Sequence, residues 1–302
     1  MKKLSLLLSI CLLFLLVGCK GETPTTQTKQ IEFLQKVGYE TYCNLVDKDL
    51  QSKLSTVFTS SGVTEQRQNV FFDHVNQFNQ SVNSDLLVND FTKIDLETNQ
   101  YDPYDMMDQW NAKHPEFIGY NCRITAFSLF SDYIKVDEKA EVRDDILFMD
   151  EYALESDDTG LCGDSIDKFK AFYSTIPTVM SKDENEHVNV VLNDWKQRGI
   201  SFEKNDKMSL VTVFFHEVED DSTYLFIGHV GVLIELQDGV CFIEKIAFQE
   251  PYQISKFKDR TQLNDYLMAK YDVNFDQPTA SPFIMENDKL MQGYRKNPNN
   301  TQ

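Results

Sequence analysis

Apolar residues recur three and four positions apart in two stretches near the N-terminus, at Leu50, Leu54 and Val57 and at Phe71, Val75 and Phe78. This spacing predicts two amphipathic helices, each with one face turned toward a core. The polar stretch 59–62 ends the first helix, and Thr64 begins the second. We therefore expect residues 31 to about 80 to be mainly helical.

The remaining patterns change in character along the chain. Residues 81–120 are mixed, with a short Met106–Trp110 segment. Helices are expected at Cys122–Tyr133, Ile166–Tyr173, Val188–Arg198 and Arg260–Tyr271. Segments rich in Val, Ile, Phe and Tyr predict strands at Ser209–Val218, Tyr224–Leu236 and Val240–Phe248. Asp238-Gly239 is a hairpin signal between the last two strands. Helices followed by an antiparallel sheet indicate an α+β fold.

The first residues have the layout of a secretory leader. Lys2 and Lys3 precede an apolar run from Leu4 to Val17 that is short for a membrane span. The run ends in Leu15-Leu16-Val17-Gly18-Cys19, which resembles the lipobox of bacterial lipoproteins. The resemblance implies that residues 1–18 are a signal peptide, and that a lipid on Cys19 holds the mature chain on the outer face of the cell membrane. Two acyl chains on this cysteine give the stable anchoring that one chain cannot.

Residues 20–30 contain no apolar side chain that could be buried, and residues 19–30 are expected to be a lipid-anchored flexible tether. We expect residues 31–290 to form a single α+β domain, with a helical part 31–135, an acidic insertion 136–205 and a sheet 206–250. A polar tail, 291–302, closes the chain.

The charge balance narrows the range of partners. The 302-residue chain carries a net charge of −19, and loss of the leader removes two lysines and leaves −21. Nucleic acid and anionic lipid would repel such a chain, so neither is an expected partner. An acidic surface on an exported protein is explained most simply by solubility.

Four cysteines follow Cys19, at Cys43, Cys122, Cys162 and Cys241. None forms a C-x-x-C pair, so no zinc or redox motif is present, and we expect no metal and no cofactor. Exported cysteines can pair, and four allow three pairings, but a chain of this length needs no disulfide scaffold.

The segment Gly119 to Phe127 is the most informative for chemistry. Gly119 permits a turn and Asn121 is a good N-cap, which puts Cys122 in the first turn of a helix. Free backbone N–H groups, the helix dipole and the adjacent Arg123 all favour a thiolate at that position. A buried structural cysteine is the alternative interpretation.

A second segment, Gly228 to Ile234, places His229 at the start of an apolar stretch of strand. Gly231 shares a face with His229 by two-residue alternation, and we expect its missing side chain to let a helix approach closely. The order is a cysteine at a helix start and, 107 residues later, a histidine opening a strand.

That order resembles papain-like cysteine hydrolases, and the segment around His229 is similar to the histidine strand of NlpC-type cell-wall amidases. The resemblance implies that Cys122 is a nucleophile, His229 a general base and acid, and Glu244 the residue that orients the imidazole. The reaction implied is thiol acyl transfer on an amide. Arg123 departs from the small polar residue that usually follows the nucleophile.

The third residue is the least constrained of the three. With a two-residue Asp238-Gly239 loop, Glu244 would pair with Leu233, on the face of His229 but several residues away. A bulge or a longer loop would bring the two together. Gln249 and Gln253 are alternatives.

The surroundings of Cys122 suggest how a substrate would be held. The backbone N–H of Cys122 would stabilise an oxyanion, with Tyr120 as a second donor and Asn121 and Arg123 beside the substrate. The acidic stretch 150–158 lacks the ligand spacing of a calcium loop and is expected to be a solvated face.

Tyr120-Asn121-Cys122-Arg123, in a lipoprotein of this length, also resembles a family of Gram-positive surface lipoproteins, domain-of-unknown-function family 4300. This resemblance spans most of the mature chain and implies no established activity. Three hypotheses follow: a thiol amidase or peptidase acting on cell-wall peptide or protein, a non-catalytic lipoprotein that binds a solute, wall component or protein, and an inactive hydrolase fold kept for interaction.

Overall fold

The computed structural model describes residues 34–300, except for 97–100, 156–158, 220–221 and 275. The predicted leader, its cleavage site, Cys19 and the tether lie outside the described residues.

The two N-terminal helices form where the apolar spacing predicts them. Helix α2 spans Lys48–Ser60 and helix α3 spans Glu65–Ser81. The Thr64 side chain caps α3 by accepting a hydrogen bond from the backbone N–H of Arg67. Between the helices, Gly62 adopts a φ of +89°, which glycine reaches without steric cost. The predicted helix break at 59–62 is confirmed.

The later helices are α4 Pro103–Lys113, α5 Cys122–Phe130, α6 Phe148–Leu154, α7 Asp164–Tyr173, α8 Glu184–Gln197 and α9 Arg260–Tyr271. Short 3-10 turns follow α3 at Ser84–Leu86 and α5 at Ser131–Tyr133. The end of the predicted 122–133 helix is thus a 3-10 turn.

A single antiparallel sheet organises the molecule, in the order β11-β10-β6-β7-β8-β9-β1-β2, with β4 beside β7. Its strands are β1 Thr41–Cys43, β2 Thr92–Lys93, β4 Ile176–Pro177, β6 Met208–Glu219, β7 Ser222–Glu235, β8 Val240–Lys245, β9 Tyr252–Phe257, β10 Phe283–Glu286 and β11 Lys289–Leu290. Strands β3 Ile134–Lys135 and β5 Ser201–Phe202 form a separate pair. Helices combined with an antiparallel sheet confirm the α+β prediction.

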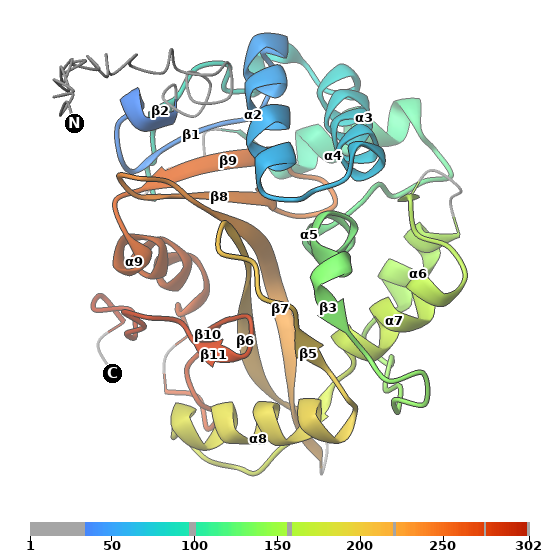
Figure 1. Cartoon of the computed structure of the whole chain (residues 1–302), viewed down its shortest axis with the longest axis vertical. Coiled ribbons are helices and arrows are strands. Elements are labelled where there is room, and N and C mark those ends of the chain that lie inside the picture. Colours follow the sequence, from blue (N-terminus) through green and yellow to red (C-terminus); the bar gives the residue numbers. More distant parts are fainter. Residues whose placement is uncertain (1–33, 97–100, 156–158, 220–221, 275, 301–302) are drawn as a thin grey trace, which may run out of the picture.

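The sheet buries both of its faces. Helix α5 packs against β7, β8 and β6, and α3 packs against α5. On the opposite side of β7 lies α9 (Figure 1), whose Leu263 and Leu267 join Leu233 and Phe242 in a second core cluster. Strands covered on both faces therefore read as continuous apolar runs.

The sequence pattern does not predict several of the strands. Residues 41–43, expected to be helical, form β1 and pair with β9. The predicted 240–248 strand ends at Lys245, and β9 and β10 were not expected as strands. The reason is that short strands acquire their stability from partners distant in sequence, so their local pattern carries little signal.

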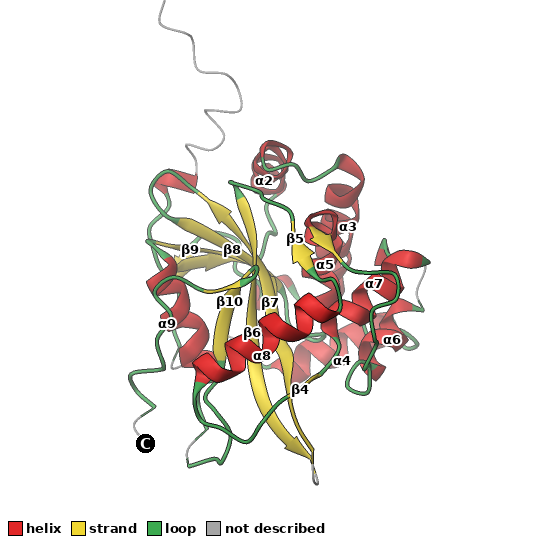
Figure 2. Ribbon diagram, turned by 60° about the horizontal axis from the view of Figure 1, so that its bottom comes forward, coloured by secondary structure: helices red, strands yellow, loops and turns green. Residues whose placement is uncertain are grey.

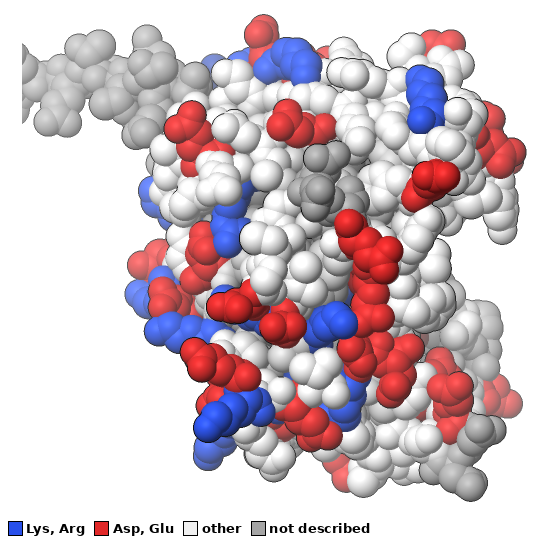
Figure 3. Space-filling view, turned by 90° about the vertical axis from the view of Figure 1, so that its right-hand side faces the viewer, with Lys and Arg blue, Asp and Glu red and all other residues white. Residues whose placement is uncertain are grey.

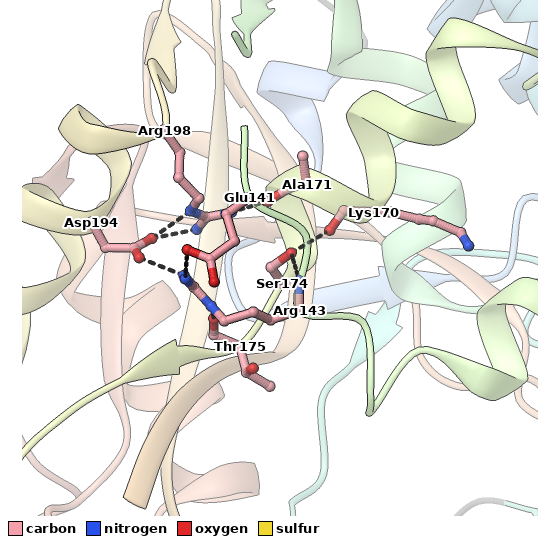
Figure 4. Close-up of polar contacts among 8 residues, drawn as sticks. All are labelled: Glu141, Arg143, Lys170, Ala171, Ser174, Thr175, Asp194 and Arg198. Carbon is pink, nitrogen blue, oxygen red and sulfur yellow. Dashed lines mark hydrogen bonds and ion pairs between the residues drawn. The ribbon is translucent and has the colours of Figure 1, made fainter. Parts of the chain in front are cut away.

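The segment expected to be an acidic insertion, 136–205, packs onto this framework. Helix α8 lies across β6 and β10 (Figure 2), where Trp195 contacts Phe214. Figure 4 shows Arg143 and Arg198 converging on Asp194 of α8, at 2.5 and 2.7 Å. This ionic cluster joins α8 to the segment that precedes α6.

Acidic side chains predominate over much of the face seen in Figure 3, consistent with the net charge of −19. Among the described residues, no helix has both the length and the apolar composition that crossing a membrane requires.

Gly231 has a different role from the one expected. A Cβ atom there would lie 2.3 Å from the ring of Phe242 and 2.6 Å from the carbonyl oxygen of Ile243. The missing side chain therefore makes room for the neighbouring strand β8, and the expectation that it admits a helix is wrong.

We predict that Gly231→Ala lowers the free energy of unfolding by about 2 kcal/mol or more, because the backbone of β8 must shift. Gly38→Ala is the matched control, since its Cβ would meet only Thr41 at an ordinary 3.9 Å. Urea unfolding measures both. Equal stability of the two variants would contradict this packing account.

Candidate active site

Cys122 is the first residue of α5, where the sequence predicts it. Asn121 is the N-cap, and its Oδ1 accepts a hydrogen bond from the backbone N–H of Ile124 at 3.0 Å. Gly119, at φ +88°, makes the turn into the helix, and a Cβ there would lie 3.3 Å from Trp110. The local sequence thus fixes the thiol at the positive end of the helix dipole.

His229 and Glu244 are brought together by the way β7 meets β8. The loop between them is four residues, 236–239, because Glu235 pairs with Val240. Phe242 therefore pairs with Leu233, which moves Glu244 two residues closer to His229 than a two-residue loop would. The longer loop that the sequence argument required is present, and the two-residue loop is wrong.

A bulge in β7 also contributes. His229 pairs with Val213 while Ile227 pairs with Phe214, so Gly228 is an extra residue in the ladder. Bulges re-aim the side chain that follows them. A Cβ at Gly228 would lie 2.4 Å from the ring of Phe215, which explains glycine at this position.

The three side chains form one hydrogen-bonded chain. His229 Nε2 donates to Glu244 Oε2 at 2.6 Å, and His229 also has a side-chain hydrogen bond with Cys122. Because Nε2 is taken by Glu244, Nδ1 is the ring nitrogen left for the thiol. The imidazole therefore connects the sulfur to the carboxylate.

The three titratable groups of this hydrogen-bonded chain are all buried. Burial raises the pKa of the Cys122 thiol, but the hydrogen bond with His229 and the positive charges of His229 and Arg123 outweigh it, so the pKa falls below its ordinary value. Burial opposes the charged form of His229, yet Cys122 and Glu244 raise its pKa to about 9. The geometry favours a thiolate–imidazolium pair at neutral pH.

The other two buried cysteines have thiol pKa values that are raised rather than lowered. Burial raises the pKa of both Cys43 and Cys241 to about 12, so these thiols stay protonated. The four cysteines among the described residues are all free, and Cys162 is exposed. Among the three buried thiols, Cys122 alone is shifted toward the nucleophilic form.

Glu244 is held by a second set of groups. Burial raises its pKa, but the hydrogen bond and charge of His229, the charge of Lys270 and a hydrogen bond from Tyr266 lower it below the ordinary value. Tyr266 donates to Glu244 Oε1 at 2.7 Å, and Gln253 Nε2 donates to the same oxygen at 3.0 Å. Gln253 thus supports Glu244, whereas Gln249 lies in the turn that follows β8.

Tyr271, the last residue of α9, was not expected at this site. Its ring stacks on His229 with centroids 5.0 Å apart. Nothing local in the sequence signals this contact, because α9 reaches the site only through its packing on the sheet.

A family model described as Domain of unknown function (DUF4300) matches residues 41–291. The chain belongs to this family. No curated protein and no solved structure matches this chain. The DUF4300 match contains Cys122, His229 and Glu244, and the family description names no activity.

The residues expected to contact a substrate are engaged within the DUF4300 domain. Arg123 makes two hydrogen bonds to Asp150, at 3.0 and 2.6 Å, and one to the Ile227 carbonyl. Asn121 Nδ2 also donates to Asp150, at 2.7 Å. Asp150 thus binds the side chains on both sides of Cys122, and the partners of Arg123 are an internal acid and a backbone carbonyl.

Asp150 is completely buried, so the expectation of a solvated acidic face is wrong for this residue. The pairing with Arg123 is the physical reason, since a carboxylate is buried only with partners. Tyr120 is also buried and stacks on His74 with centroids 3.9 Å apart. Among the described residues, no group of three or more His, Cys, Asp or Glu could hold a metal ion.

We predict that Asp150→Asn destabilises the protein by about 3 kcal/mol or more, because it leaves the mostly buried Arg123 without its counter-charge. The matched control is Asp132→Asn. Arg67 binds Asp132 through the same two-bond geometry, at 2.6 Å for each bond, but Asp132 is 46% exposed. That change should cost less than about 1 kcal/mol.

Chemical denaturation of both variants makes this comparison. If Asp150→Asn and Asp132→Asn unfold at the same denaturant concentration, the Asp150 contacts do not hold α6 to the start of α5.

Proposed function

We propose that this protein is an extracytoplasmic, lipid-anchored cysteine amidase or peptidase with a papain-like catalytic arrangement. Its substrates would be cell-wall peptide or protein. The observation that carries the proposal is the chain Cys122–His229–Glu244, in which one buried cysteine is shifted toward the thiolate while the others are not.

The first half of the proposed reaction forms an acyl-enzyme. The thiolate of Cys122 bonds to the carbonyl carbon of the scissile amide, and the carbonyl oxygen takes the negative charge. The backbone N–H of Cys122, at the first position of α5, has no intrahelical acceptor and would stabilise that oxyanion. His229 gives its proton to the leaving nitrogen as the C–N bond breaks.

The second half releases the acid. Water attacks the thioester carbon, and His229 takes the proton of that water. The C–S bond then breaks, which restores the thiolate and frees the carboxylic acid product. Glu244 would keep the imidazole oriented and stabilise its positive charge through both halves, with the bond at 2.6 Å.

The anchoring part of the proposal is supported by the leader alone. Lys2, Lys3, the apolar run and Gly18-Cys19 are the features of a lipoprotein signal. An anchor at Cys19 would leave the body outside the membrane, where cell-wall peptide is present.

A non-catalytic binding lipoprotein is the second hypothesis, and one observation favours it. Cys122 is only 6% exposed and His229 only 1% exposed, so a substrate has little direct access to the pair. An enzyme of this design must admit its substrate by a local movement.

We predict that p-nitrophenyl acetate acetylates Cys122 of the mature chain with release of p-nitrophenolate. His229→Ala should slow this step by roughly a hundredfold or more at neutral pH, because the imidazole no longer keeps the sulfur ionised. Absorbance follows the released product, and peptide mass spectrometry locates the acetyl group. Cys162→Ala, at the exposed cysteine, is the control that should retain the reaction.

The same preparations are then incubated with purified peptidoglycan and with denatured protein, and new amino groups are counted. Release of amino groups that persists in Cys122→Ala contradicts the role of Cys122 as nucleophile. A Cys122 that never acylates, together with no new amino groups from either substrate, contradicts the enzyme and leaves the binding lipoprotein.

For the anchor, we predict that cells grown with alkyne-labelled palmitate label the natural chain and not Cys19→Ser. The reason is that the thiol of Cys19 carries the diacylglyceryl group in the proposed processing. Gel fluorescence and membrane fractionation measure the result, and equal labelling of the two chains would contradict the lipobox interpretation.

A further inference from the structure

A cavity of about 500 Å³ lies beside the proposed catalytic residues. Tyr271 separates the cavity from the proposed catalytic residues, because it lines the cavity and its ring stacks on His229. Gln253 and Tyr266, which hold Glu244, line the cavity too. This cavity therefore adjoins the residues that contact His229 and Glu244.

The position of Tyr271 also relates the cavity to the nucleophile. Burial raises the pKa of the Tyr271 hydroxyl, and the negative charges of Glu244, Cys122 and Glu250 raise it further. Tyr271 contacts His229, and His229 has a side-chain hydrogen bond with Cys122. Cys122 itself does not line the cavity, so a bound substrate would reach the thiol past Tyr271 and His229.

The wall of the cavity that contains Glu250 is held rigidly. The turn 246–251 begins directly after Glu244 and Lys245. The buried Lys245 donates to the carbonyls of Ala247, at 2.7 Å, and Phe248, at 3.2 Å, and to that of Glu250. Glu250 Oε2 in addition accepts a hydrogen bond from Tyr101 at 2.9 Å. The Glu250 carboxylate is therefore preorganised relative to Glu244.

The lining combines tyrosine rings and aliphatic side chains with two carboxylates and one ammonium group. Four tyrosines face the cavity, namely Tyr42, Tyr101, Tyr266 and Tyr271. The charged lining residues are Asp95, Glu250 and Lys270, and the Lys270 ammonium is already bound by the Tyr266 hydroxyl at 3.0 Å. Tyrosine faces and carboxylates together attract organic cations, and the partly desolvated setting strengthens that attraction.

We propose that this cavity binds a primary ammonium group of the substrate, such as a peptide amino terminus or an amino side chain, with Glu250 as its counter-charge. The inference rests on the proposed function, since it assigns the substrate group recognised next to Cys122. It predicts a preference for cationic over neutral and anionic peptides.

The test uses three chloroacetamides of equal length that end in an ammonium, a hydroxyl or a carboxylate. Each alkylates thiols with loss of chloride, and peptide mass spectrometry of the full-length chain resolves the rate at every cysteine. The exposed Cys162 serves as an internal reference for the intrinsic reactivity of each reagent. Relative to that reference, the ammonium reagent should label Cys122 about tenfold faster than the hydroxyl reagent, and the carboxylate reagent slowest.

Glu250→Gln should abolish the preference for the ammonium reagent without stopping the alkylation of Cys122. Glu138→Gln removes an exposed acid that does not line the cavity, and it should leave the preference intact. Equal rates for all three reagents, or a preference that survives Glu250→Gln, overturn this inference alone. A Cys122 that no reagent labels overturns the proposed function as well.

Discussion

The bond between Glu244 and His229 is the interaction on which the rest of the site depends. A buried imidazole is charged only if a carboxylate compensates for the lost hydration, and a buried thiol is ionised only if the imidazole is charged. The charged forms of Glu244, His229 and Cys122 therefore depend on one another, and the 2.6 Å bond between Glu244 and His229 couples them. The register of β7 and β8, the bulge at Gly228 and the packing of α9 all serve to keep that bond short.

Basic side chains inside the molecule join segments that are distant in the sequence. Lys245 gathers the carbonyls of the turn after β8, and Lys256 binds the carbonyls of Leu34, Gln35 and Val37 together with Asp238. Arg123 fastens α5 to α6 through Asp150. Although the chain has a net charge of −19, these basic side chains fix segments that the hydrophobic core does not cover. Each donates to several acceptors, which is the condition for burying a polar group.

Local pattern predicts the parts of this structure that local physics determines. The N-cap at Asn121, the helix break at Gly62 and the apolar strands follow from the sequence because neighbouring residues decide them. Other features depend on contacts across the fold. These are the four-residue loop after β7, the burial of Asp150 and the stacking of Tyr271 on His229. Those features became apparent only in three dimensions, and they include the register that brings Glu244 to His229.

The most direct test is a pH titration of Cys122 alkylation by iodoacetamide, resolved by peptide mass spectrometry, in the natural chain and in Glu244→Gln. In the natural chain the alkylation rate should rise at a pH below the ordinary pKa of a thiol. In Glu244→Gln the midpoint should move up, with about tenfold less thiolate at low pH for each unit of that rise. A midpoint at or above the ordinary value in the natural chain, unchanged by Glu244→Gln, would contradict the coupled triad.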